Sequence, residues 1–69
     1  MTAILCFLLW TGSIQPGHTY TTGQINYYLE SNATLYAIEL SIPGEMQLLI
    51  AQYEDEAALV EVIDKDELP

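Results

Sequence analysis

The sequence has almost no positive charge, since Lys65 is the only Lys or Arg among 69 residues and faces ten Asp and Glu. The formal net charge is −9 at pH 7 with His neutral. Phosphate groups are bound mainly by Lys and Arg, so this deficit excludes direct binding to DNA or RNA. Anionic membrane surfaces are excluded for the same reason. Basic proteins are the expected partners.

Residue types that carry nucleophilic or metal chemistry are also scarce. Cys6 and His18 are each the only residue of their type, which excludes a disulfide within the chain. We expect Cys6, in an apolar run without a basic neighbour, to be a buried small hydrophobic residue of a cytoplasmic protein. His18 has no evident catalytic partner, and the segment 64–67 lacks the spacing and the Gly of a calcium loop. We therefore predict no enzymatic activity, no metal and no cofactor.

The length allows one domain at most, and a domain of this size buries only about 60% of its unfolded surface. Hydrophobic residues make up 51% of the chain, which favours a folded core over a disordered chain. We predict one compact domain over residues 1–63, followed by an acidic tail over residues 64–69.

The longest apolar run extends from Ala3 to Trp10 and is followed by Gly12. A transmembrane helix needs about 20 apolar residues, and a secretory signal would have Lys or Arg before this run. A short apolar run closed by Gly is typical of a strand that is buried on both faces. We predict such a strand, with a short buried helix or a targeting segment as alternatives.

The next segment predicts a helix over residues 22–31. Thr21 and Gln24 have the spacing of a capping box, and Ile25, Tyr28 and Leu29 follow at helical intervals. Asn32 is suited to a left-handed residue just beyond the helix end.

Two alternating runs predict an antiparallel hairpin. In residues 34–42 the apolar positions are Tyr36, Ile38, Leu40 and Ile42, and in residues 46–53 they are Met46, Leu48 and Ile50. A three-residue loop over 43–45 would place all of them on one sheet face.

Residues 54–64 are ambiguous. Acidic residues at the start and two Ala favour a helix, whereas the β-branched residues of 60–63 favour a short strand. With a helix here, the order β-α-β-β-α predicts a small two-layer α/β domain of the α+β type. The alternative makes the last element a fourth strand.

Acidic residues concentrate near the C-terminus, because seven of the ten lie between Glu54 and Glu67, while residues 1–29 have no charged side chain. A helix over 54–64 would rise about 15 Å and place five carboxylates at about half the linear charge density of duplex DNA. Such a cluster is either a solvated face or a docking surface for a basic site. The predicted contact residues are Glu54, Asp55, Glu56, Glu61 and Asp64.

Two tyrosines are added to this surface. Tyr27 lies outside the apolar stripe of the helix predicted over residues 22–31, and Tyr53 adjoins the acidic segment. Tyr is a favoured interface anchor, although both residues could instead cover the core.

These features predict a small cytoplasmic protein that blocks a basic, nucleic-acid-binding site on a larger protein. In size and charge the chain is similar to small acidic phage inhibitors of the anti-CRISPR, anti-restriction and DNA-mimic kind, although no motif matches one family. The alternatives are an assembly subunit that uses its uncharged N-terminal half as an oligomer interface, and a secreted or membrane-associated peptide.

Overall fold

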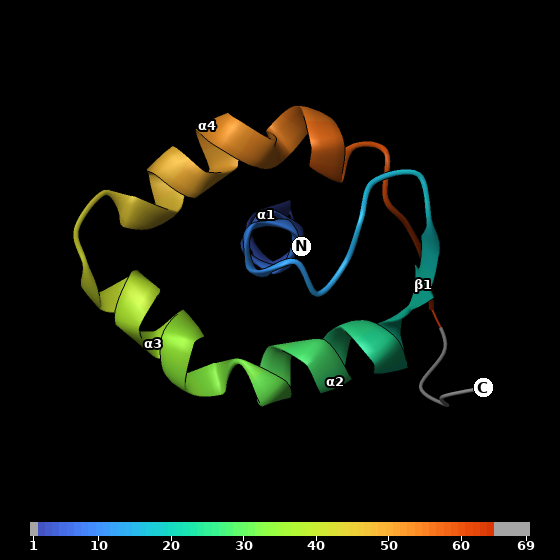
Figure 1. Cartoon of the computed structure of the whole chain (residues 1–69), viewed down its shortest axis with the longest axis horizontal. Coiled ribbons are helices and arrows are strands. Elements are labelled where there is room, and N and C mark those ends of the chain that lie inside the picture. The colour runs from blue at the N-terminus through green and yellow to red at the C-terminus, as the bar shows by residue number, and fades with distance from the viewer. Residues whose placement is uncertain (1, 65–69) are drawn as a thin grey trace.

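The computed structural model describes residues 2–64, so the predicted tail beyond Asp64 lies outside the described residues. Four helices and two short strands occur in this range (Figure 1). In chain order they are α1 (Thr2–Thr11), β1 (Thr19–Thr21), α2 (Thr22–Ser31), α3 (Ala33–Ser41), α4 (Glu45–Ala57) and β2 (Glu61–Ile63).

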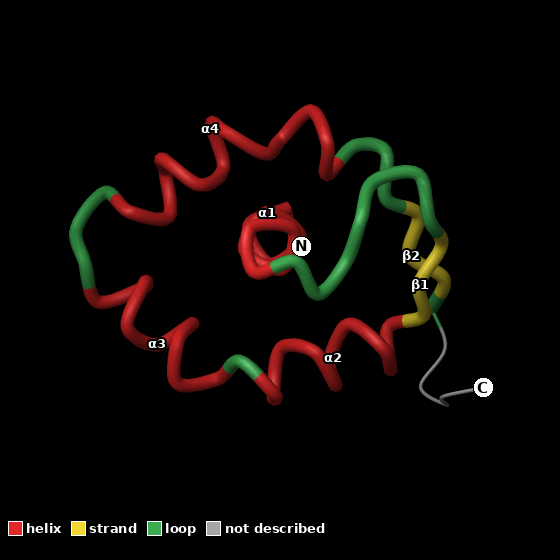
Figure 2. The backbone as a smooth tube through the Cα atoms, in the orientation of Figure 1, coloured by secondary structure: helices red, strands yellow, loops and turns green. Residues whose placement is uncertain are grey.

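The apolar N-terminal run forms a central helix that the other elements encircle. Figures 1 and 2 view α1 end-on, with α4 on one side of it, α2 and α3 on the other, and the strands closing the ring. Ten helical residues rise about 15 Å, which is close to the shortest dimension of the molecule, 17 Å. Helix α1 therefore runs through the thickness of the ring.

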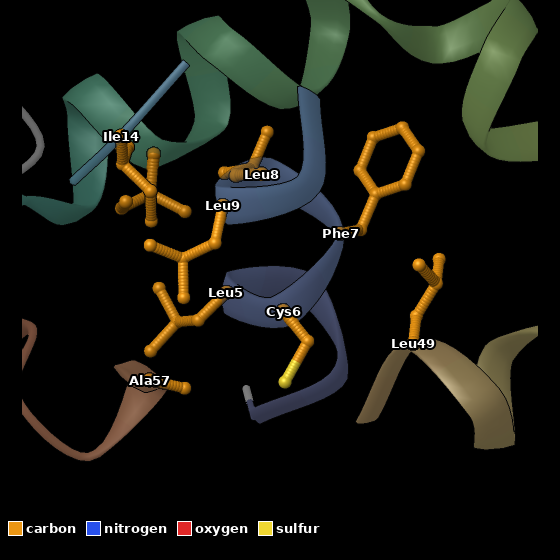
Figure 3. Close-up of a cluster of buried hydrophobic side chains, with 9 residues drawn as sticks. Leu5, Cys6, Phe7, Leu8, Leu9, Ile14, Leu49 and Ala57 are labelled. Carbon is orange, nitrogen blue, oxygen red and sulfur yellow. The ribbon is translucent and has the colours of Figure 1, made fainter. Parts of the chain in front are cut away.

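The predicted strand over residues 3–10 is wrong, and the alternative of a short buried helix is right. Ala and Leu make up half of this run and both favour helix, whereas Ile4 is its only β-branched residue. Five consecutive residues are buried, as expected of a helix surrounded on all sides: Leu5, Cys6, Phe7, Leu8 and Leu9. Figure 3 shows their side chains leaving α1 in several directions, with Leu49 and Ala57 of α4 nearby.

Gly12 ends α1 in a Schellman motif. Its φ is +83°, in the left-handed region that favours Gly. The Gly12 N–H donates to the Leu9 carbonyl at 3.1 Å, and the Ser13 N–H donates to the Leu8 carbonyl at 3.0 Å. These two bonds satisfy carbonyl groups that the end of the helix leaves free.

The predicted helix over 22–31 is confirmed as α2, together with its capping box. The Gln24 N–H donates to Thr21 Oγ1 at 3.0 Å, and the Thr21 N–H donates to Gln24 Oε1 at 2.9 Å. Asn32 does follow the helix, but its φ of −114° is not left-handed. Its side-chain amide instead donates to the Tyr28 carbonyl at 2.8 Å and to Ser13 Oγ at 3.2 Å, which ties α2 to the loop after α1.

The predicted antiparallel hairpin is wrong, because residues 33–41 and 45–57 form helices α3 and α4. The inward residues of α4 follow a helical period: Met46, Leu49, Ile50, Tyr53 and Ala57. Of the residues assigned to the hairpin core, Ile38, Leu40, Ile42 and Leu48 are exposed.

The only sheet in residues 2–64 is a parallel pair of three-residue strands, β1 and β2, in which Thr19 pairs with Glu61. A mixed helix–strand architecture is therefore found, but with a different topology from the predicted one. The ambiguous segment 54–64 contains two elements. Its first residues end α4, and residues 61–63 form the short strand that was the alternative.

Candidate functional site

The five predicted acidic contact residues lie where α4 ends and β2 begins. Glu54, Asp55 and Glu56 occupy the last turn of α4, Glu61 opens β2, and Asp64 follows that strand. All five side chains are exposed. We call this set the acidic end.

Backbone hydrogen bonds order the short connection between the last turn of α4 and Glu61. The Ala58 N–H donates to the Glu54 carbonyl at 3.1 Å, and the Leu59 N–H donates to the Glu56 carbonyl at 3.0 Å. The chain then joins β1, where the Glu61 N–H donates to the His18 carbonyl at 3.2 Å. A tight turn between α4 and β2 thus keeps the acidic residues on a short, well-bonded piece of chain.

The predicted spacing of these carboxylates is wrong. Because α4 ends at Ala57, Glu61 and Asp64 do not continue the helix that carries Glu54. The estimate of about half the charge density of DNA assumed one continuous helix over 54–64 and does not apply. What the structure has is a cluster at a helix terminus rather than a regular line of charges.

The position of the cluster on α4 concentrates negative potential. A helix C-terminus carries a partial negative charge, and acidic side chains there are unfavourable. Helix α4 has three of them in its last turn and no basic residue. The only Lys of the chain, Lys65, lies outside the described residues. Within residues 2–64 the acidic end therefore has no Lys or Arg to neutralise it.

The two predicted tyrosines lie on different parts of the molecule, Tyr53 directly before the acidic end on α4 and Tyr27 on α2. Tyr53 is half-buried and packs against the hydrophobic core, so it serves the fold. Tyr27 is 57% exposed, but it belongs to α2, which lies across α1 from α4 (Figure 1). Its ring meets that of Tyr28 at 5.8 Å and 67°. Tyr27 is available to a partner only on a different part of the surface.

Sequence reasoning missed a second surface feature, an apolar region formed by α3, Ile42 and Leu48 of α4, with Glu45 as its charged neighbour in the first turn of α4. We call it the α3 face, and its large members are Leu35, Ile38, Leu40, Ile42 and Leu48. The alternating apolar pattern of the sequence had led us to place four of them on the buried face of a sheet. The available signal was a run of 14 residues, 31–44, in which Glu39 is the only charged residue.

Cys6 is fully buried in α1. Burial raises the pKa of its thiol, and the nearby negative charge of Glu54 raises it further. Cys6 is therefore held as a neutral thiol, the opposite of what a nucleophile or metal ligand requires. No group of three or more metal-binding side chains occurs within residues 2–64.

No protein-family model, curated protein or solved structure matches the chain. No helix in the part of the chain that the structure describes is long and apolar enough to cross a membrane. A function must therefore be inferred from the residues of this chain.

Proposed function

We propose that the protein is a small acidic binding protein that occupies a basic, nucleic-acid-binding site on a larger protein in the cytoplasm. The observation that carries this proposal is the acidic end, where three exposed carboxylates share the C-terminal turn of α4 without a Lys or Arg in residues 2–64. No catalytic, metal or cofactor chemistry is part of the proposal.

Like charges in this arrangement repel one another and the helix terminus in the free chain. A partner that supplies Lys or Arg side chains would remove both repulsions, so a basic site should bind there more strongly than a neutral one. Complementary charge also speeds diffusional encounter. The same complementarity would exclude nucleic acid from the partner's site, as in the small phage-encoded inhibitors that the chain is similar to in size and charge.

The test compares two double variants with the same net charge. Glu54→Gln with Glu56→Gln removes two of the five negative charges of the acidic end, whereas Glu30→Gln with Glu45→Gln removes two negative charges from α2 and the start of α4. Tagged wild-type and variant chains are incubated with a lysate of the source cell at about 50 mM salt and washed at about 500 mM. A partner captured by the wild type is then purified for direct binding and for displacement of its DNA or RNA.

We expect the Glu54/Glu56 variant to lose at least about tenfold in affinity for that partner, and the Glu30/Glu45 variant to bind like the wild type. High salt should release the complex, and bound DNA or RNA should be displaced by the wild-type chain. Equal binding by both double variants would reject a role of the acidic end. Binding that leaves the partner's nucleic acid in place would reject the blocking function.

A further inference from the structure

Helix α3 has the reverse of the usual arrangement of charged and apolar side chains. Its one charged residue, Glu39, is 7% exposed, whereas Ile38 is 50% exposed and Leu40 is 55% exposed. Ile42, just after the helix, is 44% exposed, and Leu48 on α4 is 61% exposed. Large apolar side chains that are exposed on one helix and its neighbouring turn are characteristic of a protein interface.

The position of the α3 face limits what can cover it. Figure 1 places α3 and the α3–α4 turn at one end of the long axis, and the end of α4 with the strands at the other. The acidic end is thus far from the α3 face in a molecule that is 36 Å long. A basic partner would be drawn to the acidic end, whereas the α3 face offers it nothing to neutralise.

We propose that the α3 face binds a second copy of the same chain in a twofold-symmetric dimer. Two chains of net charge −9 repel each other, and contact through the α3 face is the approach that keeps their acidic ends farthest apart. The acidic ends would then lie at opposite extremes of the dimer, well beyond the screening length of about 8 Å at physiological salt. On α3 itself the only charged side chain is that of the buried Glu39, so contact between the outer surfaces of two α3 helices brings no exposed charge of α3 into the interface.

The outer surface of α3 suits contact with an identical helix. Ala33, Ala37 and Ser41 recur every four residues and are exposed, with Ile38 and Leu40 on either side of them. Large side chains of one copy can therefore pack over small residues of the other, and a twofold axis repeats each such contact in the opposite direction. The Ser41 hydroxyl donates to the Ile38 carbonyl at 2.7 Å, so its hydrogen needs no water when the face is covered.

The dimer is independent of the proposed inhibition and responds oppositely to salt. Salt weakens a complex between the acidic end and a basic site, but it screens the repulsion between two acidic copies and should favour the dimer. With the wild-type chain alone, sedimentation equilibrium over roughly 10–300 µM is expected to show a monomer–dimer equilibrium that shifts toward dimer as salt rises. A monomer at every concentration and salt would overturn the proposal.

A matched pair of substitutions locates the contact. Ile38→Asp introduces a charge into the α3 face, and Leu59→Asp introduces the same charge at a residue that is 64% exposed near the acidic end. We expect Ile38→Asp to raise the dimer dissociation constant about tenfold or more and Leu59→Asp to leave it nearly unchanged. Equal effects of both variants, or no effect of Ile38→Asp, would overturn the proposal. Circular dichroism confirms that each variant is folded.

Cross-linking gives a second, independent readout. Ala37→Cys places a thiol at the centre of the small-residue surface, while the native Cys6 is fully buried. Near a twofold axis the two new thiols can come within disulfide distance. Under mild oxidation we expect covalent dimers of Ala37→Cys and none of Leu59→Cys. Cross-linking of Leu59→Cys at the same rate would show random collision and overturn the proposed interface.

Discussion

Ile38 and Glu39 are adjacent on α3, yet the apolar side chain is 50% exposed and the acidic one is 7% exposed. Tyr36 provides a physical reason for this orientation. Its ring meets that of Phe7 on the central helix at 4.9 Å, edge to face. Residues three apart share one face of a helix, so directing Tyr36 toward α1 also directs Glu39 inward. Glu39 Oε2 is buried and has no hydrogen-bond partner among residues 2–64.

Removing the charge of Glu39 should therefore stabilise the fold. A buried, unpaired polar group costs about 1–3 kcal/mol and a charged one more, so Glu39→Gln is expected to raise the free energy of unfolding by about 1 kcal/mol or more. Urea unfolding followed by circular dichroism measures this change. The control is Glu30→Gln on the exposed face of α2, for which we expect a change within about 0.5 kcal/mol. A destabilised Glu39→Gln would mean that the carboxylate has a stabilising partner.

The left-handed Gly12 provides a prediction about the end of α1. Apart from its two chain neighbours, no part of residues 2–64 lies within 4 Å of where a Cβ on Gly12 would be, so Gly12→Ala tests backbone conformation alone. We expect the unfolding free energy to fall by about 1–2 kcal/mol. Asn tolerates the left-handed region better, so Gly12→Asn at the same position should cost less. Equal stability of Gly12→Ala and the wild type would show that α1 does not end in this conformation.

Local signals in the sequence predicted α2 and its cap, because a capping box involves only neighbouring residues such as Thr21 and Gln24. The end of α1 had a similar signal, since Gly after an apolar run also marks a helix C-terminus. We assigned that Gly to the end of a strand, although the Leu-rich composition favoured helix. The buried nature of the run was correctly predicted, but the class of element was not.

Packing against α1 determined whether the short apolar runs form strands or helices, which their sequence pattern left open. Met46, Leu48 and Ile50 fit a strand period, while Met46, Leu49, Ile50 and Tyr53 fit a helix period, and only the central α1 selects the second set. The parallel pairing of Tyr20 with Val62 joins segments about 40 residues apart, and no local pattern shows it. The acidic end was evident from composition, whereas its shape and the α3 face depend on where α4 ends and how α3 is rotated.

The raised pKa of Cys6 gives the stability a specific pH dependence. The thiol pKa of the folded chain lies above 9.0, its value without burial. Below about pH 9 the Cys6 thiol is protonated in both the folded and the unfolded chain, and its contribution to stability is fully present. At higher pH the unfolded chain loses the thiol proton first, which favours unfolding and reduces this contribution. The loss can reach about 1.4 kcal/mol per pH unit.

Comparison with Cys6→Ala isolates this contribution, since the titration of the tyrosines is common to both chains. Urea unfolding at about pH 7 and about pH 10 is expected to show a smaller stability difference between wild type and variant at the higher pH. A difference that stays constant between these pH values would contradict a raised pKa in the folded chain.

Adjacent leucines on α4 test the fold itself. Leu49 is 2% exposed and contacts the core around α1, whereas Leu48 is 61% exposed. Leu49→Ala should lower the unfolding free energy by about 2–5 kcal/mol, and Leu48→Ala by no more than about 0.5 kcal/mol in the monomer. The antiparallel hairpin suggested by the alternating pattern places Leu48 in the core and Leu49 outside, so it predicts the opposite order.

Urea unfolding of both variants, at a concentration where the chain is monomeric, therefore decides between a helix and a strand at residues 46–53. A larger loss for Leu48→Ala would reject the central-helix architecture together with the α3 face that depends on it.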